Sequence, residues 1–190
     1  MVEIGSATSR RALLGFITAA PTIAVAVPAS PWASPLSRLC EEWNDEPAIL
    51  RRSNEGRSLS EFRYHNAESF FVSVEKGLVR GRCDLLYRTG IVMQLGISSH
   101  LLDVGFDDRW CARHVGLKVA KGLAYSNATG FDCDDADTNL LAAILTPYDK
   151  WRNRMMRQRG YDDGPFTAGQ IHHLTRALLD RVRDVTGHPR

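Results

Sequence analysis

The sequence lacks the patterns that mark several common classes of protein. Its four cysteines are far apart and form no C-x-x-C pair, so neither a zinc ribbon nor a thioredoxin-like redox motif is present. Its main apolar run, Ala12–Val27, is shorter than the roughly 20 residues that span a bilayer, so we expect no permanent membrane anchor. The net charge is only +2, which gives no strong overall attraction for nucleic acid or anionic lipid. The remaining composition, 44% hydrophobic and 24% charged, is that of an ordinary globular protein.

The N-terminal segment has the order of charge and hydrophobicity of a secretory signal. Arg10 and Arg11 stand directly before the uncharged run Ala12–Val27, as the basic region stands before the apolar region of a signal peptide. Small residues at the −3 and −1 positions predict cleavage after Ala29 or Ala26, within residues 26–33. We therefore expect a removable signal over residues 1–29 and a mature chain over residues 30–190.

The residues around the paired arginines resemble a known export motif. Ser9, Arg10, Arg11, Leu13 and Leu14 are similar to the twin-arginine (Tat) signal, in which Ser or Thr precedes two arginines, any residue and two apolar positions. The resemblance implies the Tat translocase as a partner and a periplasmic or secreted location. At its N-terminus only, the chain is also similar to short bacterial proteins of unknown function, many of them prophage-encoded, that carry such a signal. That group implies no activity.

The alternative for this segment is an amphipathic or buried N-terminal helix of a cytoplasmic protein. Pro21 and Pro28 would interrupt such a helix, because proline removes a backbone hydrogen bond and clashes with the preceding turn. Removal of a signal containing Glu3, Arg10 and Arg11 lowers the net charge from +2 to +1. The mature chain has the length of one domain.

Apolar spacing predicts a mainly α-helical fold, an irregular single-domain bundle of about five to seven helices. Capping residues mark several helix starts, namely Asp107 or Asp108, Asp134 or Asp135, and Thr167 with Gln170. The expected helices and core segments cover residues 35–45, 84–95, 107–125, 134–145, 146–160 and 167–187. The last of them carries the most regular apolar stripe, with Arg181 on the opposite side: Ile171, Leu174, Leu178, Val182 and Val185.

The segment from Ser69 fits two periodicities. Alternating Phe70, Val72 and Val74 suit a strand, and Lys76-Gly77 can close a small hairpin near residues 70–82. We favour a helix, because the neighbouring segments are helical and an isolated hairpin is only marginally stable. The stretch from Arg51 to Ser58 reads as a polar loop.

The cysteines leave several interpretations open. An oxidising periplasm permits three pairings of four cysteines, and spacing does not choose among them. A free cysteine on an apolar helix face instead behaves as a small buried hydrophobe. The residues concerned are Cys40, Cys83, Cys111 and Cys133.

An acidic cluster invites a search for a metal site. Counted from Asp132, the spacing fails the EF-hand pattern at its fifth, sixth and twelfth positions. Acidic residues at a helix start are favoured by capping and by the helix dipole, which explains the cluster without a metal. Its members are Asp132, Asp134, Asp135 and Asp137.

Two further groups are candidates for chemistry. Cys111 and His114 stand three residues apart on an expected helix and suggest a Cys/His hydrolase, although such dyads normally come from separate segments. Lys150, Arg154 and Arg157 share one helix face and could bind an anion, which suggests a cytoplasmic prophage-type protein that contacts nucleic acid. The near-neutral mature charge argues against nucleic acid as a partner. We favour an exported, non-enzymatic binding or interaction module; the sequence does not identify its ligand or any cofactor.

Overall fold

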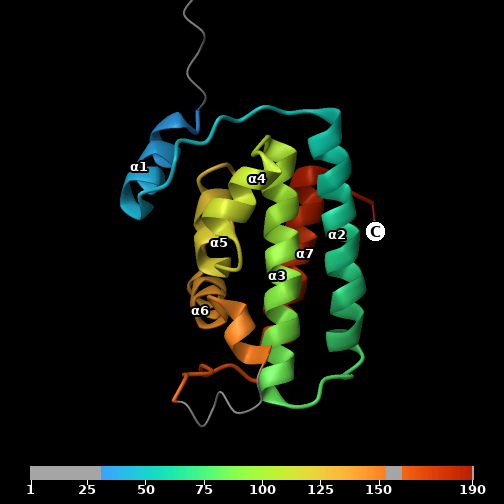
Figure 1. Cartoon of the computed structure of the whole chain (residues 1–190). Helices are drawn as coiled ribbons and strands as arrows, with labels where there is room; N and C mark the ends of the chain where they lie inside the picture. Colours follow the sequence, from blue (N-terminus) through green and yellow to red (C-terminus); the bar gives the residue numbers. More distant parts are fainter. Residues whose placement is uncertain (1–30, 153–159, 190) are drawn as a thin grey trace, which may run out of the picture. The chain divides into compact units, whose positions relative to one another are not determined.

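The computed structural model describes residues 31–152 and 160–189, which belong to one compact unit (Figure 1). These residues contain no strand, so the mainly α-helical single-domain fold is confirmed. The signal motif lies outside the described residues. None of the described helices combines the length and the hydrophobicity needed to cross a bilayer. The elements are α1 (Ala33–Trp43), α2 (Asn54–Glu75), α3 (Arg82–Val104), α4 (Asp108–Trp110), the π-helical turn η1 (Cys111–Val115), α5 (Val119–Asn127), α6 (Ala136–Leu145), the 3₁₀ turn η2 (Tyr148–Arg152) and α7 (Ala168–Thr186).

Helix α3 is the centre of the fold. It contacts α2, α7, α5, α6 and η2, with α2 on one side and α5 and α6 on the other (Figure 1). Helix α3 runs unbroken through Gly90. The glycine is needed there because a Cβ would collide with Tyr148 of η2. Gly96 likewise lets Leu178 and Leu179 of α7 approach closely. The glycines therefore serve packing inside an unbroken helix.

The segment 70–75 is helical, and no hairpin forms near residues 70–82. Helix α2 continues to Glu75 because Phe71 and Val74 extend its buried face, whereas Phe70 and Val72 are exposed. The expected polar loop is also shorter than predicted. Ser53 caps α2 by accepting a hydrogen bond from the Gly56 backbone, so the helix starts at Asn54.

The prediction of a single helix over residues 107–125 is wrong, because the helix is interrupted in its middle. Asp107 caps the start as predicted, since its carboxylate accepts hydrogen bonds from the Arg109 and Trp110 backbones. The chain then forms the π turn η1, and Gly116, with φ of 55°, ends it. Positive φ is the conformation that glycine adopts at little cost. Helix α5 begins only at Val119.

Thr146, the first residue of the helix expected over residues 146–160, starts no α-helix. Its hydroxyl donates to the Ala142 carbonyl and accepts from the Ala120 backbone, so it links α6 to the start of α5. Residues 148–152 form the short 3₁₀ turn η2. Residues 153–159 of the expected helix lie outside the described residues.

Helix α7 has the caps that its sequence predicts. Thr167 and Gln170 form a capping box, and Gly187 ends the helix in the left-handed conformation. The predicted apolar stripe of α7 is only partly buried, because Leu174 and Val185 lie at the margin of the buried face. Arg181 is not a free surface residue, since its Nε donates to the Phe131 carbonyl at 2.6 Å. The fully buried positions of the stripe are Ile171, Leu178 and Val182.

Candidate functional site

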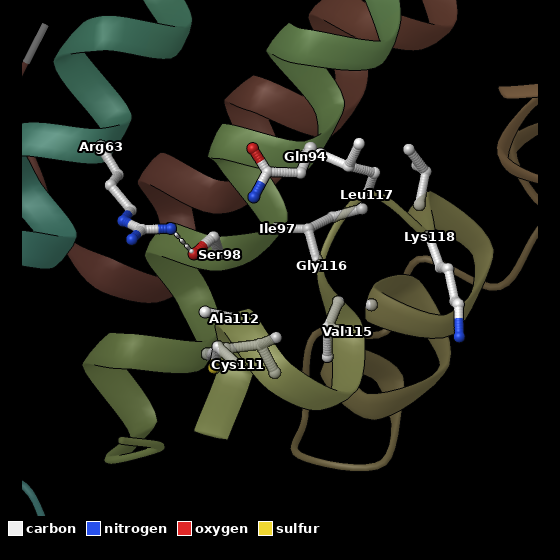
Figure 2. Close-up of a pocket in the computed structure, with 13 residues that line it drawn as sticks. Arg63, Gln94, Ile97, Ser98, Cys111, Ala112, Val115, Gly116, Leu117 and Lys118 are labelled. Carbon is white, nitrogen blue, oxygen red and sulfur yellow. Dashed lines mark hydrogen bonds between the residues drawn. The ribbon is translucent and has the colours of Figure 1, made fainter. Parts of the chain in front are cut away.

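A cavity of about 370 Å³ lies between α3 and the η1–α5 connection, and we call it the α3–η1 cavity (Figure 2). Its size is at the lower end of the range of roughly 300–1,000 Å³ typical of small-molecule pockets. Polar groups from α2, α3 and η1 interrupt its walls: Arg63, Gln94, Ser98 and Cys111. The apolar walls are formed by Ile97, Leu101, Ala112, Val115, Leu117 and Val119.

The π turn shapes one wall of this cavity. Its wider backbone turn carries Cys111, Ala112 and Val115 toward the cavity. Gly122 permits α5 to approach closely, because a Cβ there would press on Ile97 and Val115.

Arg63 is a charge-paired cation beside the cavity. Its Nη1 donates to the Ser98 hydroxyl at 2.6 Å, and its Nη2 donates to the Asp108 carboxylate at 2.5 Å. The ion pair with Asp108 balances its charge. Arg63 therefore brings hydrogen-bond donors to the cavity without a net positive charge.

Cys111 and His114 are not brought together in one site. Cys111 lines the α3–η1 cavity, where burial raises the pKa of its thiol to about 12. A neutral thiol is neither a nucleophile nor a metal ligand at neutral pH. His114 lines a different cavity, of about 330 Å³, beside Trp110 and Glu46. The geometry does not favour a Cys/His dyad.

His114 instead belongs to a buried polar cluster centred on Asp45. Its Nδ1 is 3.2 Å from the Asp45 carboxylate, Lys121 Nζ is 2.6 Å from that carboxylate, and the Tyr125 hydroxyl donates to it at 2.6 Å. Burial alone would raise the pKa of Asp45, but the hydrogen bonds from Lys121, Tyr125 and His114 outweigh it and hold that pKa below its ordinary value. We call these four residues the Asp45 cluster.

The Asp45 cluster fastens the chain after α1 to η1 and α5. The neighbouring Glu46 carbonyl accepts a hydrogen bond from the Trp110 indole at 3.0 Å, which adds a second link. Sequence reasoning missed this cluster because its members are distant along the chain and match no motif. One signal was available: Lys121 and Tyr125 lie four apart on a helix face that is otherwise apolar, and a buried lysine requires a partner.

A second polar network joins α2, α3 and the C-terminal residues. The Ser60 hydroxyl lies 2.7 Å from His188 Nε2 and donates to the Ser99 carbonyl at 2.7 Å. Burial is the main cause that lowers the pKa of His188, so the neutral imidazole is favoured. Ser60 is 0% exposed and His188 is 3% exposed, so no substrate reaches this pair in the structure. It holds residues far apart in sequence together.

The residues of the acidic cluster form an ion pair, a helix cap and a backbone hydrogen bond within the described part of the chain. Asp132 pairs with Arg181, Asp135 caps α6 through the Thr138 backbone, and the Asp134 carbonyl accepts from Asn139. Asp137 lies in the first turn of α6. Within residues 31–152 and 160–189, no three His, Cys, Asp or Glu side chains are arranged to hold a metal ion.

Of the three basic residues expected to share one helix face, Lys150 is the one that the structure describes. This residue is half-buried, donates to the Thr146 carbonyl at 2.9 Å, and lies over the Trp151 and Tyr161 rings. Burial lowers its pKa. Arg154 and Arg157 lie outside the described residues. Lys150 therefore contributes to local packing, and a shared anion-binding face with the two arginines stays a prediction.

No disulfide joins any of the four cysteines, all of which lie in the described part of the chain. Cys40, Cys83 and Cys111 are buried, and Cys133 is half-buried. Their positions agree with the interpretation of cysteine as a small buried hydrophobe.

Comparison of the chain with known protein families, with curated proteins and with solved structures found no match. Its site must therefore be interpreted from its own geometry.

Proposed function

We propose that the chain is an exported, non-enzymatic binding protein whose helical domain holds one small, largely apolar molecule in the α3–η1 cavity. The observation that carries this proposal is the cavity itself, with its apolar walls and a few convergent polar groups around about 370 Å³. Pockets of this kind bury most of the surface of a small ligand and use their few polar groups to orient it.

The chemistry of the polar groups supports binding over catalysis. The thiol in the wall, Cys111, is held in its neutral form by burial, which raises its pKa to about 12. The charge of Arg63 is balanced by the Asp108 carboxylate, and two of its N–H groups bind Ser98 and Asp108. Among the residues that the structure describes, no histidine lines this cavity, so the group that most often acts as general base is missing from its described walls.

Occlusion of the cavity tests the proposed function. Ala112 is exposed at the cavity wall, so Ala112→Phe places a ring in the cavity without disturbing the core. We expect the full chain to bind the neutral fluorescent probe N-phenylnaphthylamine saturably, and Ala112→Phe to weaken that binding at least about tenfold, which corresponds to roughly 1.4 kcal/mol. Fluorescence titration measures both.

The matched control is Ala143→Phe, which adds the same ring at an exposed alanine of α6 away from the cavity. This variant is expected to bind the probe as the unchanged chain does. Equal affinities of all three proteins, or no saturable binding by the unchanged chain, would show that the cavity is not the binding site.

Export rests on the sequence of the N-terminus, and we propose the Tat translocase as the partner that recognises it. Replacing both Arg10 and Arg11 with lysine keeps the charge but removes the paired guanidinium groups. We expect this double variant to remain unprocessed in the cytoplasm, whereas the unchanged chain is recovered from the periplasm with a mass that corresponds to cleavage after Ala29 or Ala26. Fractionation and intact-mass measurement decide the outcome. Unprocessed cytoplasmic protein in both cases would contradict export.

A further inference from the structure

Gln94 lines the α3–η1 cavity with a side-chain amide that is free to recognise a ligand. It is half-buried on α3, and within the described part of the chain it makes no hydrogen bond. A carboxamide offers two N–H donors and one carbonyl acceptor. The ligand group that complements this carboxamide has a hydrogen-bond acceptor and a hydrogen-bond donor on neighbouring atoms.

The charge around Gln94 is balanced. Figure 2 shows the Gln94 amide on the same side of the cavity as Arg63 and Ser98. The Arg63 guanidinium is paired with the Asp108 carboxylate at 2.5 Å, and it retains N–H groups beyond the two that bind Ser98 and Asp108. This end of the cavity thus has spare donors and no spare positive charge.

The other cation at the cavity does not compensate an anion beside Gln94. Lys118 is exposed, and Figure 2 shows its terminal nitrogen pointing away from the Gln94 amide. A carboxylate placed beside Gln94 would lose hydration without gaining an unpaired cation, which is costly in an apolar pocket. It would also leave the Gln94 carbonyl without a donor, and an unpaired buried acceptor costs free energy.

We propose that the ligand of the α3–η1 cavity is an uncharged molecule with a small apolar body and a carboxamide or lactam group, which pairs with the Gln94 amide. The ligand carbonyl accepts from the Gln94 NH₂ or from Arg63, and the ligand N–H donates to the Gln94 carbonyl. This inference rests on the proposed function, because it specifies the ligand of the same cavity.

Two probes with the same apolar body separate an amide site from an anion site. Phenylacetamide and phenylacetate share a benzyl group and differ in the polar end. We expect the full chain to bind phenylacetamide at least about tenfold more tightly than phenylacetate, as measured by nuclear magnetic resonance titration. Gln94→Leu, which keeps a similar side-chain volume without polar atoms, should weaken the binding of phenylacetamide at least about tenfold, because the ligand amide loses its partner. Lys118→Met should leave that binding unchanged.

The outcomes separate failure of this inference from failure of the proposed function. Three outcomes would overturn the amide assignment: phenylacetate binding as tightly as phenylacetamide, an affinity for phenylacetamide that Gln94→Leu leaves unchanged, or binding of N-phenylnaphthylamine without binding of either phenylacetyl probe. Each of them would leave the cavity as a binding site. A dependence of phenylacetate affinity on Lys118 would identify an anion site instead. If N-phenylnaphthylamine does not bind, or binds Ala112→Phe equally well, the proposed function itself fails.

Discussion

Replacing Asp45 with alanine is expected to lower the free energy of unfolding by about 3–5 kcal/mol, the cost typical of breaking a buried ion pair. The variant leaves the Lys121 ammonium without its counter-ion in a site where that side chain is only 10% exposed. It also removes the acceptor of the Tyr125 hydroxyl and the neighbour of His114. Chemical denaturation of the variant and of the unchanged chain measures the effect.

Glu46→Ala is the matched control for this prediction. Glu46 is the next residue, and its carboxylate forms an exposed ion pair with Arg113, both side chains being more than two-thirds exposed. Its contact with the Asp45 cluster is at 3.8 Å, the long distance from His114 Nε2. Exposed pairs contribute about 0–1 kcal/mol, so Glu46→Ala should change stability little. Similar small losses for both variants would show that the Asp45 cluster does not fasten the chain after α1 to the fold.

The contribution of Asp45 should also depend on pH in one direction. Because the folded state holds the pKa of Asp45 below its ordinary value, the ionised carboxylate stabilises the fold above the unfolded-state pKa of about 3.9. That stabilisation is lost as the pH falls below this value and through the lower folded-state pKa. The stability difference between Asp45→Ala and the unchanged chain should therefore shrink on acidification below about pH 4.

Replacing Leu178 with alanine is expected to cost about 2–5 kcal/mol, the range measured for truncating buried large aliphatic residues. Leu178 is 0% exposed, lies midway along α7, and approaches Gly96 of α3 closely. The truncation opens a void where two helices meet at a glycine, and the backbone cannot collapse to fill it without moving α7.

The control for Leu178 is His173→Ala, an exposed position on the same helix. A surface substitution of this kind stays within about 0.5 kcal/mol. Arg181 is unsuitable as a control because it binds the Phe131 carbonyl. Denaturation midpoints that shift equally for Leu178→Ala and His173→Ala would mean that α7 is a peripheral helix and not part of the core.

The features that the sequence predicted correctly are those set by neighbouring residues. A cap depends on side chains within one helical turn, so Asp107, Asp135 and the Thr167/Gln170 box were readable. The buried stripe of α7 was readable for the same reason, except at its edges, where burial depends on what the partner helix covers.

The features that sequence reasoning missed depend on contacts between distant segments. Gly90 makes room for Tyr148, and this role is visible only in the folded chain. Gly116 ends a π turn that helical spacing does not distinguish from a continuous helix. Asp45 meets His114 and its other partners across more than 60 positions of sequence, and the cavity exists only because these segments pack as they do.

The most direct test of the central claim, that the α3–η1 cavity binds a small apolar molecule, is methyl-resolved nuclear magnetic resonance of the full chain during titration with N-phenylnaphthylamine. We predict saturable shifts concentrated on the methyl groups that line the cavity, those of Ile97, Leu101, Val115 and Val119. Exposed apolar side chains elsewhere, such as Ile49, Leu78 and Leu140, serve as internal references. Shifts centred on those exposed residues, or no saturable shift in the cavity methyl groups, would contradict the account.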